Sequence, residues 1–348
     1  MKNVNKKYWL IFLFITILLV VLFFANIAFG SVSIPFSASF NIFFGLNNTN
    51  EVWNNIILGS RLPQAITAIL AGAALSVGGL VLQTFFRNPL ADPSVLGISS
   101  GASLGVAILF FFPNFIYLSL SSSGFILQNF TVIAAAIIGA GLILLIIISL
   151  TSRIRDNAML LVSGIMISAI ASSFIGIMKV FSRSESVHSF AIWGLGSFSM
   201  VTRSHLYFFF PLVLLGLIMS LFLIKTLNTL LLGEKAAQNL GLNIAKARIG
   251  IIIIVGFLTA VVTAYCGPIA FLGIAIPHIS KLILKTSNHA ILMPAVILIG
   301  ALCALVCTLI AKLPGLDDAI PVNAITSLFG APIVIWIILK RNKNERSA

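Results

Sequence analysis

Charged side chains are scarce in this sequence. Asp, Glu, Lys and Arg make up 8% of its 348 residues, whereas hydrophobic residues make up 59%. A soluble domain carries about 25% charged residues, because its surface must face water. The scarcity therefore excludes a soluble fold and indicates an all-α integral membrane protein. At roughly 20 apolar residues per span plus loops, the length suits about ten spans.

Acidic residues are scarcer than basic ones, which gives a formal net charge of +13. The basic residues do not cluster on a polar face, as binding to nucleic acid would require. They stand at the ends of apolar runs, where lipid head groups and membrane topology explain them. The three cysteines, Cys266, Cys303 and Cys307, form no C-x-x-C pair, so we expect small apolar roles and no metal site.

The sequence also lacks three features that would supply energy or chemistry. It has no G-x-x-x-x-G-K-[ST] loop to hold ATP. Its apolar runs hold almost no Asp, Glu or His, which an ion-coupled transporter usually needs. No nucleophile–base pair or metal cluster suggests catalysis. We therefore expect no catalytic residue and no cofactor in this chain, and an energy source outside it.

Charged and turn-forming residues divide the chain into ten apolar runs. The first follows Lys7 and is too long for the core of a cleaved signal peptide, so we expect a retained span. A charge-free stretch between Asp92 and Arg153 is divided by Pro113–Asn114 and by residues 121–124. The expected spans are residues 8–29, 61–87, two within 92–153, 157–178, 204–225, 248–265, 269–285, 290–311 and 320–339.

Ten spans place both termini on one side of the membrane. Most basic residues then fall on the side of the termini, which the positive-inside rule makes the cytoplasm. The outer side keeps Arg61, Lys179, Arg183, Arg203 and Lys312. Small residues such as Gly97, Gly101 and Gly105 recur every fourth position, which predicts close helix packing.

Three segments between or within the spans have unusual composition. Asn88-Pro89-Leu90-Ala91-Asp92-Pro93 predicts a rigid turn. Residues 231–242 predict a short polar helix with a glycine at each end. In residues 267–281, Pro268 and Pro277 remove helix hydrogen bonds, so we expect an irregular, buried segment. His278 has no partner at metal-ligand spacing, which favours a structural hydrogen-bonding role.

These stretches, together with Arg61-Leu62-Pro63 and residues 320–332, resemble the FecCD (BtuC-like) permease family of ABC importers. That family moves ferric siderophores, haem, ferric citrate or cobalamin. The resemblance extends from residue 61 to residue 340, and it implies one BtuC-like permease domain over residues 1–348. The sequence departs from the family pattern at Lys281, Thr308, Ala319 and Asn323.

The resemblance also implies roles for individual residues. Coupling to the ATPase would involve a cytoplasmic loop at about residues 227–246, with Leu232, Gly233, Glu234, Ala237, Leu240 and Gly241. The translocation pathway would follow about Met159–Met178 and Phe190–Ser199, with Ser163, Met166, Ser168, Ser172 and Ser173. Docking of a binding protein would use Arg61 and Lys312, with Arg183 and Arg203 as weaker candidates. The structural motif residues would be Asn88, Pro89, Pro93, Gly97, Gly101, Gly267, Pro268, Pro277 and His278.

The implied function is that of the membrane-spanning subunit of an ATP-driven importer in the cytoplasmic (inner) membrane of a bacterium. Its partners would be a second copy of itself, two ABC ATPase subunits that bind ATP and Mg, an extracytoplasmic binding protein, and lipid. The expected cargo is an iron complex, most often a ferric siderophore, with haem and cobalamin as alternatives. Two other classes stay open: a secondary transporter or channel, and a structural subunit of a membrane complex.

Overall fold

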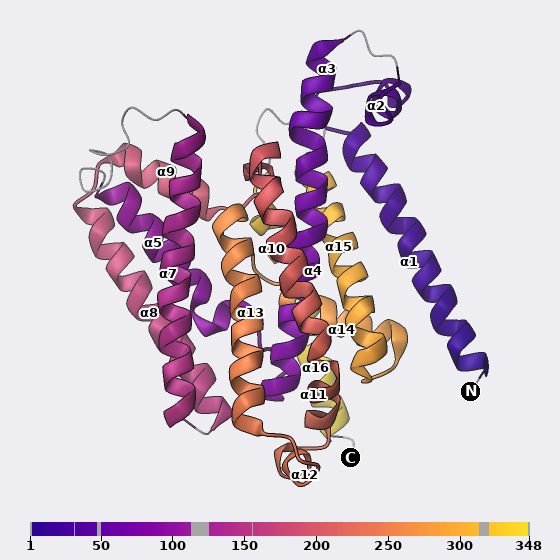
Figure 1. Ribbon diagram of the computed structural model, residues 1–348, viewed down its shortest axis with the longest axis vertical. Helices are drawn as coiled ribbons and strands as arrows, with labels where there is room; N and C mark the ends of the chain where they lie inside the picture. Colours follow the sequence, from indigo (N-terminus) through magenta and orange to yellow (C-terminus); the bar gives the residue numbers. More distant parts are fainter. Residues whose placement is uncertain are drawn as a thin grey trace. The chain divides into compact units, whose positions relative to one another are not determined.

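A computed structural model describes residues 2–30, 32–46, 50–112, 125–154, 156–312 and 320–346. Every regular element in these ranges is helical (Figure 1). Within these described ranges, seven helices are long and apolar enough to cross a membrane, and three shorter apolar helices accompany them. Together they correspond to the ten predicted spans, so the prediction of an all-α membrane bundle is confirmed. The break predicted near Pro113 and residues 121–124 lies outside the described residues.

Contacts divide the chain into two compact units. The first comprises Met1–Leu80, Ser197–Leu215 and Ile269–Ala348. It contains α1 (Lys2–Ala28), α2 (Phe36–Phe43), α3 (Glu51–Ile56), η1 (Ile57–Arg61), most of α4 (Leu62–Phe86), η4 (Phe198–Met200), the first part of α10 (Arg203–Phe222), α14 (Leu272–Leu284), α15 (His289–Ala311) and α16 (Val322–Arg346).

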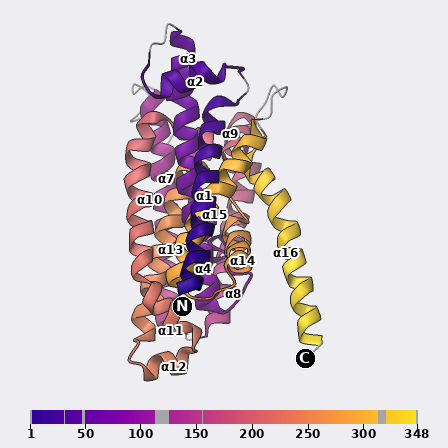
Figure 2. The same cartoon turned by 90° about the vertical axis from the view of Figure 1, so that its right-hand side faces the viewer.

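Within this first unit, α15 packs against α1, α14 and α16. Asn26 of α1 donates a hydrogen bond to the Leu305 carbonyl of α15 at 3.1 Å. The start of α1 and the end of α16 lie at the same end of the unit (Figures 1 and 2), as an even number of spans requires.

The second unit comprises Val81–Gly196 and Gly216–Pro268. It contains the end of α4, η2 (Pro93–Leu96), α5 (Ile98–Phe111), α7 (Phe125–Arg153), α8 (Asn157–Val180), α9 (Ser184–Gly194), the end of α10, α11 (Ile224–Leu231), α12 (Glu234–Asn239) and α13 (Ile244–Cys266). Helix α5 lies at its centre, in contact with α7, α8, α9 and α13.

The small residues predicted to pack closely do so in α5. A Cβ built on Gly105 would lie 2.1 Å from the Ala135 carbonyl oxygen of α7. Gly101 likewise faces α7, because a Cβ there would lie 2.6 Å from the Gly139 carbonyl oxygen. Such contacts bring two backbones together where lipid provides no hydrophobic drive between helices.

Candidate coupling and translocation sites

The segment predicted to couple to an ATPase contains the short helix expected there. Gly233 precedes α12 with φ of 109°, and Gly241 follows it with φ of 87°. Ala237 points into the protein and is fully buried, whereas Leu232 and Leu240 are 66% and 67% exposed. Two exposed leucines that flank a short helix, Leu232 before it and Leu240 directly after it, form an apolar surface of the kind that binds another protein. The coupling role of these residues stays a prediction.

The first residue of α12 is hydrogen-bonded to the first residue of α8. The Asn157 side-chain amide nitrogen donates to Glu234 Oε1 at 2.7 Å. The Asn157 amide oxygen accepts a hydrogen bond from Arg248 Nη2 of α13 at 2.9 Å. We call this chain of three side chains, Arg248, Asn157 and Glu234, the Asn157 relay. Sequence reasoning missed Asn157, whose only local signal is its place at the start of a span.

Further contacts fix the buried end of the relay. Arg248 is only 6% exposed, and its Nη1 donates to the Ile154 carbonyl at 2.7 Å. Its guanidinium also lies 5.7 Å from the ring centroid of Phe85, near the end of α4. Asn157 makes an additional hydrogen bond to the Phe85 carbonyl at 3.3 Å.

The predicted turn after α4 packs beside this relay. The Asn88 side chain accepts from the Leu90 amide at 2.9 Å, and the Ala91 amide donates to the Asn88 carbonyl at 3.1 Å, as a tight turn requires. Arg87 donates to the Leu230 carbonyl of α11 at 3.2 Å. The Asn88-to-Pro93 motif is therefore the turn predicted, and the residue before it contacts the segment leading into α12.

Asp92 ends the same turn as the N-cap of η2, with Pro93 at the first position of that helix. Its carboxylate accepts hydrogen bonds from the amide and the hydroxyl of Ser94. Burial raises the pKa of Asp92, and the two bonds from Ser94 act in the opposite direction.

A cavity of about 710 Å³ opens beside Glu234. Its walls come from the end of α4, the start of α8, and α12. They carry charges of both signs, from Arg87, Lys235, Asp156 and Glu234. Space therefore exists next to the relay into which the side chains of α12 can move.

The residues predicted to line the pathway lie on α8, most of whose surface is exposed. Its buried stripe is Leu160, Gly164, Ala171 and Ile175. Met166 is 54% exposed, and Ser172 and Ser173 are also exposed, whereas Ser163 and Ser168 are partly buried. The hydroxyls of Ser163, Ser168 and Ser173 each donate to a carbonyl one turn earlier. Their role in transport stays a prediction.

The short helix after α8 begins earlier than expected. The predicted range was 190–199, whereas α9 spans Ser184–Gly194 and a separate 3₁₀ turn, η4, covers Phe198–Met200. Phe190 and Trp193 are the buried face of α9. Lys179, at the end of α8, lies over the Phe190 ring at 5.1 Å.

Gly97 of the structural motif lets η2 approach α8. It has φ of 79°, and a Cβ there would lie 3.0 Å from the Gly164 carbonyl oxygen of α8. Conversely, a Cβ on Gly164 would lie 2.5 Å from the Val95 carbonyl oxygen. Helix α8 is thus held by the turn region at two levels: by Asn157 at its start and by Gly164 two turns later.

The segment 267–281 is less irregular than predicted. The break covers residues 267–271, where Gly267 has φ of 73° and would clash with the Trp193 carbonyl if it carried a Cβ. Pro268 follows in this break, but Pro277 lies inside the continuous helix α14, as does His278. The expectation that Pro277 interrupts the helix is wrong. One missing N–H removes a single bond, to the carbonyl four residues earlier, and the helix continues past it.

Asn323, a departure from the family pattern, has a defined contact. Its side-chain oxygen accepts from the Ala270 amide at 3.0 Å. The irregular segment is thereby tied to the start of α16. Thr308, another departure, donates its hydroxyl to the Ala304 carbonyl of its own helix at 2.7 Å.

Arg61, predicted to dock a binding protein, is 4% exposed. It ends the π-helical turn η1, two residues before Pro63. Its Nη1 donates to the carbonyls of Ile27 and Ala28 at 3.0 and 2.6 Å, and its Nη2 donates to the Val32 carbonyl. The guanidinium thus caps the C-terminal end of α1, where carbonyls lack partners and a positive charge is favoured. Docking through Arg61 stays a prediction.

Lys312, the second predicted docking residue, follows α15 and is partly buried. Within the described ranges, its Nζ has no hydrogen-bond partner. Burial, with a smaller contribution from the charge of Arg61, lowers the pKa of Lys312 from 10.5 to about 8. Arg61 and Lys312, the two predicted docking residues, therefore lie close enough for their positive charges to repel each other.

This shift predicts a stability that depends on pH. The folded protein releases the Lys312 proton near pH 8, whereas the unfolded chain keeps it until about 10.5. The folded state is therefore penalised below pH 8, and the penalty is relieved as pH rises through this window. In thermal unfolding in detergent, we expect stability to rise between about pH 8 and 10.5. In Lys312→Met this rise should shrink, but in Lys246→Met, which alters an exposed lysine, it should persist. Equal pH profiles for the two variants would contradict the assignment.

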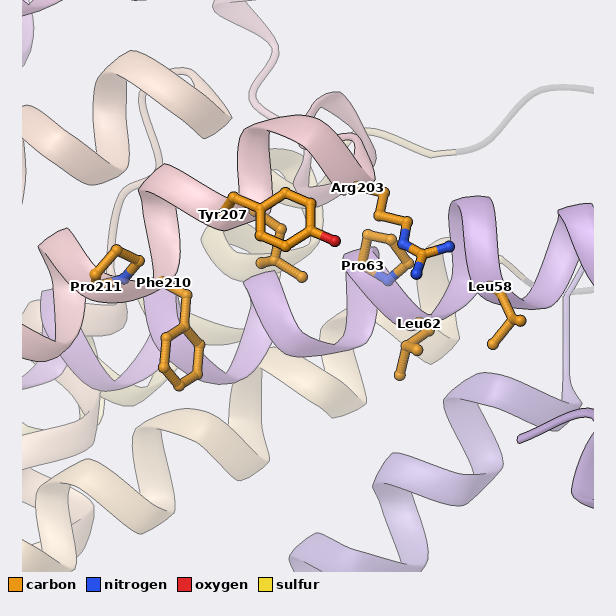
Figure 3. Close-up of a pocket in the computed structure, with 8 residues that line it drawn as sticks. Leu58, Leu62, Pro63, Arg203, Tyr207, Phe210 and Pro211 are labelled. Atoms are coloured by element: carbon orange, nitrogen blue, oxygen red, sulfur yellow. The ribbon is translucent and has the colours of Figure 1, made fainter. Parts of the chain in front are cut away.

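A groove of about 310 Å³ lies in the first unit between the η1–α4 segment and α10 (Figure 3). Its walls are mainly apolar, with Leu62, Pro63 and Phe210 among them. Arg203 and Tyr207 reach over Pro63 from α10. Arg203, a weaker docking candidate, is exposed and so differs from Arg61.

Comparison with known proteins identifies the class. The model of the FecCD transport family matches residues 18–340. The hemin transport system permease protein HmuU of Yersinia pestis is 33% identical over 96% of this chain and 96% of HmuU. The vitamin B12 import system permease protein BtuC of Salmonella typhi is 33% identical over 80% of this chain and 82% of BtuC. The molybdate import system permease protein MolB of Haemophilus influenzae is 33% identical over 84% of this chain and 83% of MolB.

A solved structure agrees with these relatives. A metal-chelate type ABC transporter in an inward-facing conformation superposes with a TM-score of 0.81 at 30% identity, covering 95% of this chain and 99% of that one. The protein is thus a multi-pass membrane permease of an ABC importer, a transport subunit and not an enzyme, with ATP hydrolysis assigned to a separate subunit. It belongs to the FecCD transport family.

Proposed function

We propose that two copies of this chain form the membrane pathway of an importer that takes up an iron complex, a ferric siderophore or haem. Two ATPase subunits that bind ATP and Mg supply the energy, and an extracytoplasmic binding protein delivers the cargo. The assembly sits in the cytoplasmic membrane of a bacterium. The observation that carries this proposal is family membership over residues 18–340, combined with the exposed surface of α8, which carries no charge before Lys179.

The surface of α8 supports passage of a bulky chelate. Between Asp156 and Lys179 the helix has no charged residue, and its exposed residues are apolar or carry small hydroxyls. An apolar helix face left uncovered in one copy is suited to a second copy or to lipid, and the small hydroxyls offer weak contacts. A wall of this kind lets a large cargo slide, whereas a tight site would retain it.

The relatives support an inference about the class of cargo but not about the particular compound. HmuU, BtuC and MolB are equally identical to this chain, yet their names state hemin, vitamin B12 and molybdate. HmuU matches the largest share of this chain of the three. This coverage and the apolar α8 surface favour an iron complex over a small, highly charged oxyanion.

The cargo is tested by uptake into proteoliposomes. The chain would be purified from native membranes with the subunits that accompany it. ATP-dependent uptake would then be compared for ferric hydroxamate and catecholate siderophores, haemin, cobalamin and molybdate. We expect uptake of one iron complex and little uptake of molybdate. Uptake of molybdate alone would overturn the cargo, and uptake driven by an ion gradient without ATPase would overturn the ABC function.

A further inference from the structure

The backbone turns on either side of α12 are poorly suited to transmit a displacement of this helix. Gly233 and Gly241, at its two ends, both have positive φ, so the chain turns on either side of the helix. Turns of this kind absorb displacement because their dihedral angles can change without breaking a helix. Side-chain contacts of α12 therefore provide a separate route by which its movement reaches the rest of the protein.

We propose that Asn157 is a positioning residue that passes movement of α12 to the predicted pathway helix α8, through the Asn157 relay. This inference rests on the proposed function, because it assumes that α12 meets an ATPase. Glu234 is the relay's end on the moving helix, Arg248 is its buried end on α13, and Asn157 joins them.

The chemistry of the relay fixes the Asn157 amide in one orientation. Its oxygen faces the Arg248 guanidinium, and its nitrogen faces the Glu234 carboxylate. A flipped amide would point its nitrogen at a cation and its oxygen at an anion. Both hydrogen bonds involve a charged partner, so they are stronger than bonds between neutral groups. Breaking either of these two hydrogen bonds of Asn157 therefore costs free energy.

The position of Asn157 decides what the relay moves. It is the first residue of α8, directly after the N-cap Asp156, whose carboxylate accepts from the Met159 amide at 2.9 Å. A helix is stiff along its axis, so displacement of its first turn is carried along the helix. The cavity beside Glu234 leaves room for the movement. Its consequence would be a shift of the exposed face of α8 that includes Met166.

The relay itself can be tested on the isolated chain. Asn157→Ala, Glu234→Ala and the double variant would be compared in thermal unfolding in detergent, as a double-mutant cycle. We expect the second substitution to add little once the first is present. Additive effects would show that the two side chains do not act together, and they would overturn the relay whatever the chain transports.

The positioning role is tested in the assembled transporter with Asn157→Asp, which keeps the shape but presents a carboxylate to Glu234. We expect the ATPase subunit to co-purify and to hydrolyse ATP at the normal rate, while cargo uptake per ATP falls about tenfold, within the usual range of coupling between sites. Ser152→Ala, which removes an exposed hydroxyl bonded within its own helix, should leave uptake per ATP unchanged.

Three results separate failure of this inference from failure of the proposed function. Unchanged uptake per ATP in Asn157→Asp, with the unaltered chain active, would overturn the positioning role alone. A loss of uptake that merely follows loss of ATPase binding would overturn it too, because the residue would then only support the fold. If the unaltered chain showed no ATP-driven uptake, the proposed function would fall and the positioning role with it. The double-mutant cycle would still decide whether the relay exists.

Discussion

Gly79→Ala is expected to leave little folded protein. A Cβ at this position would lie 1.8 Å from the Gly273 carbonyl oxygen of α14, which is backbone and cannot rotate away. Gly273 is four residues before Pro277, so its carbonyl is the one that Pro277 cannot bond. Gly79 of α4 packs directly on that carbonyl. Separating the two helices to fit a methyl group should cost about 3 kcal/mol, near the upper end for overpacking.

The measurement is the yield and thermal stability of monodisperse protein in mild detergent. The matched control is Gly176→Ala in α8, because a Cβ at Gly176 would meet nothing within 4 Å. Alanine is also a better helix former than glycine, so the control should be neutral or slightly stabilising. Equal stability of the two variants would contradict close packing at Gly79.

Arg61→Met is expected to destabilise the protein by about 2–4 kcal/mol, because the carbonyls of Ile27 and Ala28 lose their donor, and a buried group left unsatisfied costs about 1–3 kcal/mol. Arg61→Lys should recover only part of the loss, since one ammonium cannot reproduce the fork of the guanidinium. Arg203→Met is the control, because Arg203 is exposed. Thermal unfolding in detergent measures all three variants.

A second measurement distinguishes loss of the Arg61 cap on α1 from nonspecific destabilisation of the fold. Without the Arg61 charge, the pKa of Lys312 should rise above about 8, and the rise of stability with pH should move to higher pH. An Arg61→Met protein as stable as the unaltered chain would contradict the capping role. Docking of the proposed binding protein is best measured in Arg61→Lys, which keeps the charge.

The ten spans could be predicted because each depends on its own composition. A run of about 20 apolar residues crosses the membrane whatever its neighbours are. The turn at Asn88 and the helix at Glu234 were also predictable, since turn-forming residues and flanking glycines act locally. The start of α9 was misplaced, because its buried Phe190 and Trp193 fall late in a short helix whose first turn is polar.

The Asn157 relay could not be predicted from local patterns. Asn157 is separated from Glu234 by 77 residues and from Arg248 by 91. A single asparagine at a helix start is typical of many helices, and only the fold shows which charges it meets. The burial of Arg61 was missed for a similar reason. Its three acceptors lie in a segment about 30 residues earlier, and composition alone makes it an ordinary interfacial cation.

Three of the four serines predicted to line the pathway have their hydroxyl protons committed to carbonyls of α8 itself. A wall that offers few donors disfavours a small charged oxyanion but gives no strong preference among bulky chelates. Selection among such chelates then belongs to the proposed delivery protein. Adaptation to a new chelate would require changes only in that protein. One bulky chelate could then replace another without a change in α8, in line with the 33% identity of this chain to both a hemin and a vitamin B12 permease.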